Sequence, residues 1–231
     1  MAFDSQTFKT RSTTATVFVI IMLTGLFLSS WSFIILFIII HFGCWYEFVR
    51  LIKKIKPSTW GYFVPFGLAY ITVPLILLVL LGFPSINSIL FQEEYQHAWQ
   101  YSPILPFGII FSIWINDTMA YLVGSLIGKT PLSKISPKKT WEGTIGGVVL
   151  CVLTISLVGE ATGYYSLELW IIIASCCAVF GTLGDLLESK LKRLAKVKDS
   201  GTLMPGHGGF LDRFDSLLIA SLAVGLYYFF L

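Results

Sequence analysis

The chain has 231 residues, of which 55% are apolar and 13% charged, and its formal net charge is +3. Its mean hydropathy of +0.79 excludes an ordinary soluble domain, because such domains lack unbroken apolar runs of helix-spanning length. The net charge is too small to indicate nucleic-acid binding, and it is better explained by membrane topology.

Seven apolar runs approach the roughly 20 residues that a bilayer core of about 30 Å requires. In chain order they cover about residues 12–30, 31–50, 61–82, 104–126, 143–160, 167–187 and 215–231. Only the stretch SSWS, Ser29–Ser32, separates the first two runs, which predicts a tight helical hairpin. The second run follows so closely that the first is not expected to be a cleavable signal peptide. The sequence therefore predicts an all-α polytopic membrane protein with about seven transmembrane helices.

The positions of the charges predict the orientation. With seven spans, all 16 lysine and arginine residues fall on one side of the membrane, which the positive-inside rule assigns to the cytoplasm. The N-terminus is then cytoplasmic and the C-terminus is outside. The cysteines lie inside the predicted spans without metal-ligand spacing, so we expect them to be packing residues: Cys44, Cys151, Cys176 and Cys177.

The two parts of the chain differ in character. Residues 1–103 resemble a membrane anchor of three spans with basic flanks, whereas residues 104–231 carry polar residues within or beside four spans. We expect the second part to be the catalytic membrane domain, with its binding loops in the cytoplasm. Glu47 is an exception in the first part, and an ion pair with Arg50 or a nearby lysine at the interface is expected for it rather than a role in the site.

Two predicted helix ends carry the same pattern of acids. Each has two acids and a serine at i, i+3 and i+4, which share one helix face: Asp185, Glu188 and Ser189, then Asp212, Asp215 and Ser216. Carboxylates at a membrane boundary are costly unless a cation offsets them. Because the ligands would be oxygen atoms, without His or Cys, Mg²⁺ or a similar ion is favoured over ordinary solvated helix ends.

Basic residues and glycines lie between these acidic turns. Gly206, Gly208 and Gly209 precede a helix start, where backbone N–H groups can approach an anion closely. Together with the acids and the basic residues they indicate a nucleoside triphosphate site, although no Walker sequence is present. Lys190 and Lys196 are expected to be positive-inside flanks instead.

A second loop adds candidate residues. Asp117 lies in the fourth run, where a carboxylate is a functional candidate. Gly124 and Gly128 form a GxxxG pair that is expected mainly to pack helices. The stretch SPKKTWEG that follows offers groups that can bind phosphate: Ser136, Lys138, Lys139 and Thr140.

The run from Ser189 to Ser216 resembles the signature of phosphatidate cytidylyltransferases, also called CDP-diacylglycerol synthases. That signature has a serine, two residues, Lys-Arg, four residues and Lys-Asp, then Pro-Gly-His-Gly-Gly and Asp-Arg-x-Asp, and the chain fills it without a gap. The upstream stretch from Asn116 to Gly143 also resembles the family. The motifs together cover about residues 114–216, whereas the first 100 residues match only loosely.

The resemblance implies transfer of a cytidylyl group from CTP to phosphatidate, which gives CDP-diacylglycerol and pyrophosphate in phospholipid biosynthesis. It implies Mg²⁺ as cofactor and leaves a second cation, divalent or K⁺, and a homodimer open. The partners are then CTP, phosphatidate and the lipid bilayer, without nucleic acid. The implied location is a bacterial-type inner (cytoplasmic) membrane, with the active site facing the cytoplasm.

The resemblance also implies roles for individual residues. Metal ions would be held by Asp185 and Asp212, with Glu188, Asp215 and Asp117. Phosphates would be bound and the reaction assisted by Lys192, Arg193, Lys198, Arg213 and His207, the last expected mainly as a phosphate donor. Further substrate-binding positions would be Ser136, Lys138, Lys139, Thr140, Ser189, Asp199, Gly206, Gly208 and Gly209.

Other functions remain open at the level of sequence. A polyprenol kinase, or a cytidylyltransferase for isoprenoid or ether lipids, would share the nucleotide site and differ at the lipid site. A cation channel or transporter would use the inner acids but would not need the neighbouring basic residues and glycines. A CDP-alcohol phosphotransferase also has acids at the membrane boundary, but its characteristic spacing is absent here.

Overall fold

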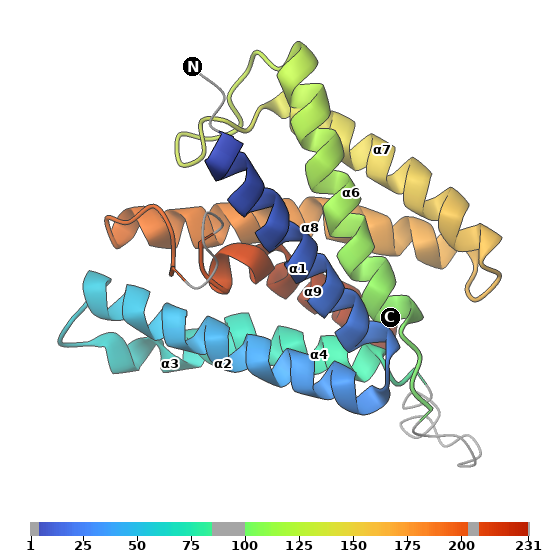
Figure 1. Ribbon diagram of the computed structural model, residues 1–231, viewed down its shortest axis with the longest axis horizontal. Coiled ribbons are helices and arrows are strands. Elements are labelled where there is room, and N and C mark those ends of the chain that lie inside the picture. The colour runs from blue at the N-terminus through green and yellow to red at the C-terminus, as the bar shows by residue number, and fades with distance from the viewer. Residues whose placement is uncertain (1–4, 85–99, 203–207, 231) are drawn as a thin grey trace.

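A computed structural model describes residues 5–84, 100–202 and 208–230 of the chain (Figure 1). Those residues form helices and connecting loops with no strand, which confirms the predicted all-α fold. Six helical segments are long and apolar enough to cross a membrane, and a shorter apolar helical stretch, Ser12–Phe27, precedes them. The chain is thus an integral membrane protein, while the orientation of its termini stays a prediction.

The predicted hairpin at the N-terminus is present. Helix α1 (Ser5–Phe27) is followed almost at once by α2 (Ser30–Ile55). Ser29 caps α2: its Oγ accepts a hydrogen bond from Ser32 N at 3.0 Å, and Ser32 Oγ accepts one from Ser29 N at 2.9 Å. This reciprocal capping satisfies two backbone donors at the helix start and fixes the tight turn.

The third span, residues 60–81, is not one regular helix. It begins as the 3₁₀ helix η1 (Trp60–Phe63), continues as α3 (Val64–Gly67) and the π turn η2 (Leu68–Thr72), and ends as α4 (Val73–Leu81). Pro74 explains the π turn, because proline has no N–H and its ring would clash with the carbonyl four residues earlier in an α-helix. The wider π turn removes that clash without ending the span.

Four long helices form the second part of the chain: α6 (Ile104–Ile127), α7 (Trp141–Ala161), α8 (Leu167–Leu194) and α9 (Leu211–Phe230). Figure 1 shows α6 beside α7, with α8 crossing the centre of the molecule, and α8 also packs along α9. With 28 residues, α8 is about 42 Å long and therefore exceeds the roughly 30 Å hydrocarbon core.

Small residues allow α6 and α7 to lie close together. A side chain added at Gly143 would meet the Gly124 Cα at 2.9 Å, and one at Gly147 would meet the Ala120 Cβ at 2.7 Å. The predicted packing role of Gly124 is therefore confirmed, and it is typical of helix contacts inside membranes. The cysteines also pack as predicted: Cys44, Cys151 and Cys177 are buried, and Cys176 is half-buried.

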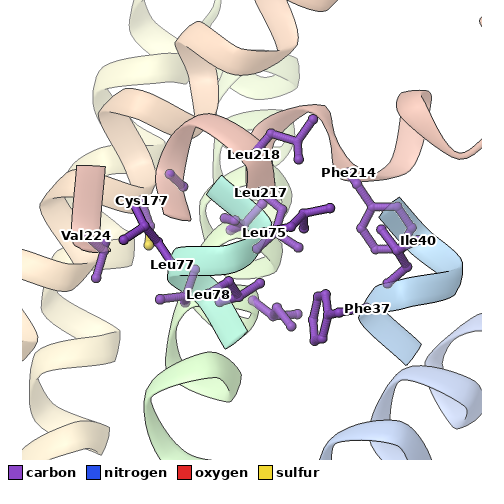
Figure 2. Packing of buried hydrophobic residues seen from close by; sticks show 14 of the residues in the cluster. Phe37, Ile40, Leu75, Leu77, Leu78, Cys177, Phe214, Leu217, Leu218 and Val224 are labelled. Atoms are coloured by element: carbon purple, nitrogen blue, oxygen red, sulfur yellow. The ribbon is translucent and has the colours of Figure 1, made fainter. Parts of the chain in front are cut away.

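The start of α9 is held by helices from the first part of the chain. Figure 2 shows Leu217 and Leu218 of α9 beside Leu75 and Leu78 of α4, with Phe37 of α2 at the same cluster, and all five are buried. Helix α9 packs against both α2 and α4. Because Asp212 and Asp215 belong to the first turns of α9, this apolar contact determines where those acids stand.

Candidate active site

Several of the predicted site residues of the second part meet around one cavity of about 510 Å³, which we call the main cavity. Helix α6, the loop before α7, α8 and α9 all contribute to its wall. Eight of the predicted site residues line it: Asp117, Ser136, Lys138, Lys139, Thr140, Asp185, Asp212 and Asp215. Its wall therefore combines carboxylates with ammonium and hydroxyl groups.

Three acids lie close together at this cavity and form what we call the acid cluster: Asp185, Glu188 and Asp215. One carboxylate oxygen from each lies within 4.8 Å of the others, and Glu188 and Asp215 are buried. Gly184 makes this possible, because a Cβ there would collide with the Asp215 carbonyl and meet the Ser216 Cα at 3.1 Å. The absence of a side chain brings α8 and α9 into contact where the acids stand.

Lys192 connects the acid cluster to Asp212. Its Nζ lies 2.5 Å from Glu188 Oε2 and 2.7 Å from Asp212 Oδ1. The other oxygen of Asp212, Oδ2, accepts hydrogen bonds from Gly209 N and Ser200 N, both at 2.8 Å. Asp185, Glu188 and Asp215 bring their oxygens together, and Asp212 is joined to Glu188 through Lys192. Metal ligation by Asp212 stays a prediction.

The loop between α6 and α7 is held by its own hydrogen bonds. Glu142 accepts bonds from Lys129 N at 3.1 Å and from Thr130 Oγ1 at 2.8 Å, and Thr140 Oγ1 caps α7 by accepting from Gly143 N. Lys139 extends from this ordered loop and forms an ion pair with Asp185. One of the expected phosphate-binding lysines therefore stands directly beside the acid cluster.

A smaller cavity of about 140 Å³ adjoins the main cavity, and we call it the side cavity. Arg213 lines it together with apolar residues of α1 and α6, among them Phe18 and Trp114. The two cavities share Asp117, Asp212, Asp215 and Ser216 as common wall residues. Arg213 therefore lies on a different side of the acids from Lys139.

Other predicted residues lie apart from both cavities. Arg193, Lys198 and Asp199 are exposed and line neither cavity, and Ser189 is buried. Gly206 and His207 lie outside the described residues. The substrate contacts assigned to all of these residues stay predictions.

The glycines before α9 have a clear structural use. Gly208 has a φ of 84°, a conformation that suits glycine, and the N–H of Gly209 points to the Asp212 carboxylate at 2.8 Å. In the structure this turn holds an acid of the protein, and its predicted contact with substrate phosphate is untested.

The expectation for Glu47 is wrong. Glu47 is 3% exposed, and its carboxylate accepts hydrogen bonds from Ser200 Oγ at 2.6 Å, Phe210 N at 3.0 Å and Leu211 N at 2.9 Å. Arg50 lies instead over the Tyr46 ring, 5.5 Å from its centroid. The isolated acid in an apolar run was the available signal, because a membrane helix retains such a residue only where it has polar partners.

The acid cluster fits a divalent cation. Oε1 of the buried Glu188 has no hydrogen-bond partner in the described part of the chain. Around it the carboxylates outnumber the ammonium groups of Lys139 and Lys192. Carboxylate oxygens are the ligands that Mg²⁺ prefers. An ion at this position would balance the charge and supply the missing partner.

Comparison with known proteins relates the chain to one family. A sequence model of the cytidylyltransferase family matches residues 69–231. The phosphatidate cytidylyltransferase of Staphylococcus saprophyticus is 49% identical over 109 residues, which are 46% of this chain and 42% of that protein. That of Staphylococcus aureus is 47% identical over the same shares of both chains. Phosphatidate cytidylyltransferase 4, chloroplastic, of Arabidopsis thaliana is 48% identical over 104 residues, which are 45% of this chain and 27% of that protein.

The match spans less than half the length of each of these relatives. The family match, by contrast, covers more than half of this chain and includes α6 to α9, which carry the main cavity and the acid cluster. On that basis the chain belongs to the cytidylyltransferase family.

Proposed function

We propose that the chain transfers the cytidylyl group of CTP to phosphatidate and releases pyrophosphate. The observation that carries this proposal is the acid cluster with Lys139 and Lys192 beside it, at one cavity formed by the ends of membrane helices. A nucleotidyl transfer between two anions needs such a mixture of metal ligands and cations. The relatives named phosphatidate cytidylyltransferase support the choice of acceptor.

The main cavity suits the nucleotide. Asp185, Glu188 and Asp215 would hold Mg²⁺, which when bound neutralises phosphate charge and aligns the reacting groups. Lys138 and Lys139 line the cavity and would bind phosphate oxygens. Ser136 and Thr140 line the same wall, and their hydroxyl groups can donate hydrogen bonds to the triphosphate.

The side cavity suits the lipid acceptor. Arg213 offers a guanidinium that can bind a phosphate with two hydrogen bonds, and Phe18 and Trp114 provide an apolar wall for the lipid. A phosphate oxygen of phosphatidate in the side cavity would then attack the α-phosphorus of CTP in the main cavity, beside the acids that line both cavities. The bond from that phosphorus to the bridging oxygen breaks, and pyrophosphate leaves with the electron pair. No protein nucleophile is needed, because the lipid phosphate is already ionised.

We place the site at the cytoplasmic face of a bacterial-type inner membrane. The basic residues of the loop before α7 and of the segment after α8 lie on the same predicted side, which supports this orientation. CTP would enter from the cytoplasm and the lipid from the bilayer, so the site has to lie at their boundary.

Purified protein with Mg²⁺, phosphatidate and CTP labelled at the α-phosphate tests the function. We expect the label in the chloroform-extractable lipid, and no transfer by the Asp185→Asn variant. Lipid labelled from γ-labelled CTP instead would identify a kinase. Transfer of the α-label to an isoprenoid or ether lipid, but not to phosphatidate, would reject the proposed acceptor.

A further inference from the structure

We propose that Glu47 of α2 is a positioning residue of the active site, which acts through Ser200 on Asp212. Glu47 lies outside residues 69–231, the part of the chain that the family matches. The part of the proposal that concerns turnover rests on the proposed function. The part that concerns Mg²⁺ binding rests only on the acid cluster.

Glu47 determines where α9 begins. Its carboxylate accepts hydrogen bonds from Phe210 N at 3.0 Å and Leu211 N at 2.9 Å. These N–H groups stand at the start of α9, where a helix offers its first donors no acceptor. By binding them, Glu47 fixes the start of the helix and with it the positions of Asp212 and Asp215 in the first turns.

Glu47 and Asp212 also share one hydroxyl group. Ser200 Oγ lies 2.6 Å from Glu47 Oε2 and 2.8 Å from Asp212 Oδ2, and it has a single hydrogen to donate. The backbone N–H of Ser200 adds a bond to Asp212 Oδ2 at 2.8 Å. Ser200 therefore keeps the two carboxylates at a fixed separation, and a change at Glu47 alters the surroundings of Asp212 directly.

The surrounding backbone is fitted to the Glu47 carboxylate. A Cβ at Gly201 or at Gly209 would overlap its oxygens. A glutamine has the same shape, but its NH₂ group cannot accept from the N–H groups at the start of α9. Glu47→Gln therefore changes hydrogen bonding with little change in volume.

The contacts continue to the acid cluster. Lys192 Nζ lies 2.7 Å from Asp212 Oδ1 and 2.5 Å from Glu188 Oε2. A displaced Asp212 would draw Lys192 with it and leave Glu188 in an altered position. We therefore expect weaker Mg²⁺ binding and slower turnover when Glu47 is replaced, as for other residues that orient metal ligands.

The experiment compares wild type, Glu47→Gln and Ser200→Ala in the full chain. Per folded protein, we expect kcat to fall about 10- to 100-fold in each variant, and the Mg²⁺ concentration for half-maximal activity to rise. The double variant should lose little more than either single variant, because both substitutions interrupt the same contact. Tyr101→Phe is the control: it removes a hydrogen bond to Leu26 O at a residue that lines neither cavity.

A second readout does not need turnover. The rise in melting temperature that Mg²⁺ produces reports its binding, and we expect this rise to be smaller in Glu47→Gln and Ser200→Ala than in wild type and Tyr101→Phe. Variants that melt earlier but keep the wild-type kcat and Mg²⁺ response would show a purely structural role and overturn the proposal. Absence of cytidylyl transfer in wild type would reject the proposed function alone, and the Mg²⁺ shift would still decide the role of Glu47. If Glu47→Gln does not fold, Ser200→Ala gives the same decision.

Discussion

Lys192 of α8 and Asp212 of α9 stand 20 positions apart in the chain, yet Lys192 Nζ lies 2.7 Å from Asp212 Oδ1. The same ammonium group lies 2.5 Å from Glu188 Oε2. The Lys192 and Asp212 side chains are 12% and 8% exposed, so this ion pair is shielded from water. One cation thus joins the two helices that bear the acids, and its removal would leave the buried Glu188 carboxylate without a cation beside it.

Lys192→Gln should therefore lower both stability and activity. Breaking a buried ion pair by removing one partner costs about 3–5 kcal/mol. We expect a clearly lower melting temperature in detergent and loss of most cytidylyl transfer. Lys190→Gln on the same helix removes an equal charge at an exposed position and is the matched control. Similar behaviour of the two variants would contradict the bridging role of Lys192.

Substitutions in the acid cluster should abolish both turnover and the stabilisation of the protein by Mg²⁺. Asp185→Asn and Glu188→Gln each remove a negative charge from the proposed Mg²⁺ ligands, so we expect turnover to fall by orders of magnitude. The stabilisation by Mg²⁺ in a thermal unfolding assay should disappear as well. Glu168→Gln, an exposed acid in the first turn of the same helix, should behave like wild type. Near-normal activity of either cluster variant would remove the metal assignment.

Arg213→Lys should lose most activity although the charge is kept. The exposed Arg213 lines the side cavity, and lysine cannot replace two parallel hydrogen bonds to a phosphate. We expect the larger effect on KM for phosphatidate rather than on KM for CTP, since Lys138 and Lys139 serve the main cavity. Lys196→Ala, at an exposed position outside both cavities, should stay close to wild type. An inactive Lys196→Ala together with an active Arg213→Lys would contradict the assignment of Arg213 to the site and of Lys196 to the flanking positions.

The orientation can be tested by cysteine labelling. Tyr164 is exposed in the turn between α7 and α8, and Lys134 is exposed in the loop between α6 and α7. In intact cells an impermeant thiol reagent should label Tyr164→Cys but not Lys134→Cys. Labelling only at position 134 would reverse the orientation. The native cysteines are buried or half-buried and should give a low background.

The lengths of the apolar runs were sufficient to predict most of the fold. Runs of apolar residues determine membrane helices because each helix satisfies its own backbone hydrogen bonds. The hairpin at Ser29 was predictable for the same reason, since only a few polar residues interrupt the apolar run. The π turn at Leu68–Thr72 was not predicted, because it arises from the local steric effect of Pro74 and leaves the hydropathy unchanged.

The site could be predicted less completely. The spacing of Asp185 and Glu188 on one helix face is a local property, and it correctly indicated that they lie together. How the acids of α9 meet them depends on how α9 packs against α8, and the close contact at Gly184 brings Asp215 to them. Glu47 was misjudged for a related reason: its partners lie more than 150 positions away, and no local pattern indicates them.

The length of α8 makes the position of the acids depend on the thickness of the bilayer. A helix of about 42 Å that crosses a hydrocarbon layer of about 30 Å has to tilt or extend its last turns beyond the layer. Those last turns carry Glu188 and Lys192, so the local thickness of the bilayer determines how deep these side chains lie relative to the lipid headgroups. A mismatch between the length of α8 and the thickness of the bilayer would therefore change the rate of turnover. In vesicles of long-chain lipids the acids would be drawn toward the acyl region, and we expect slower turnover there than in vesicles of matched thickness.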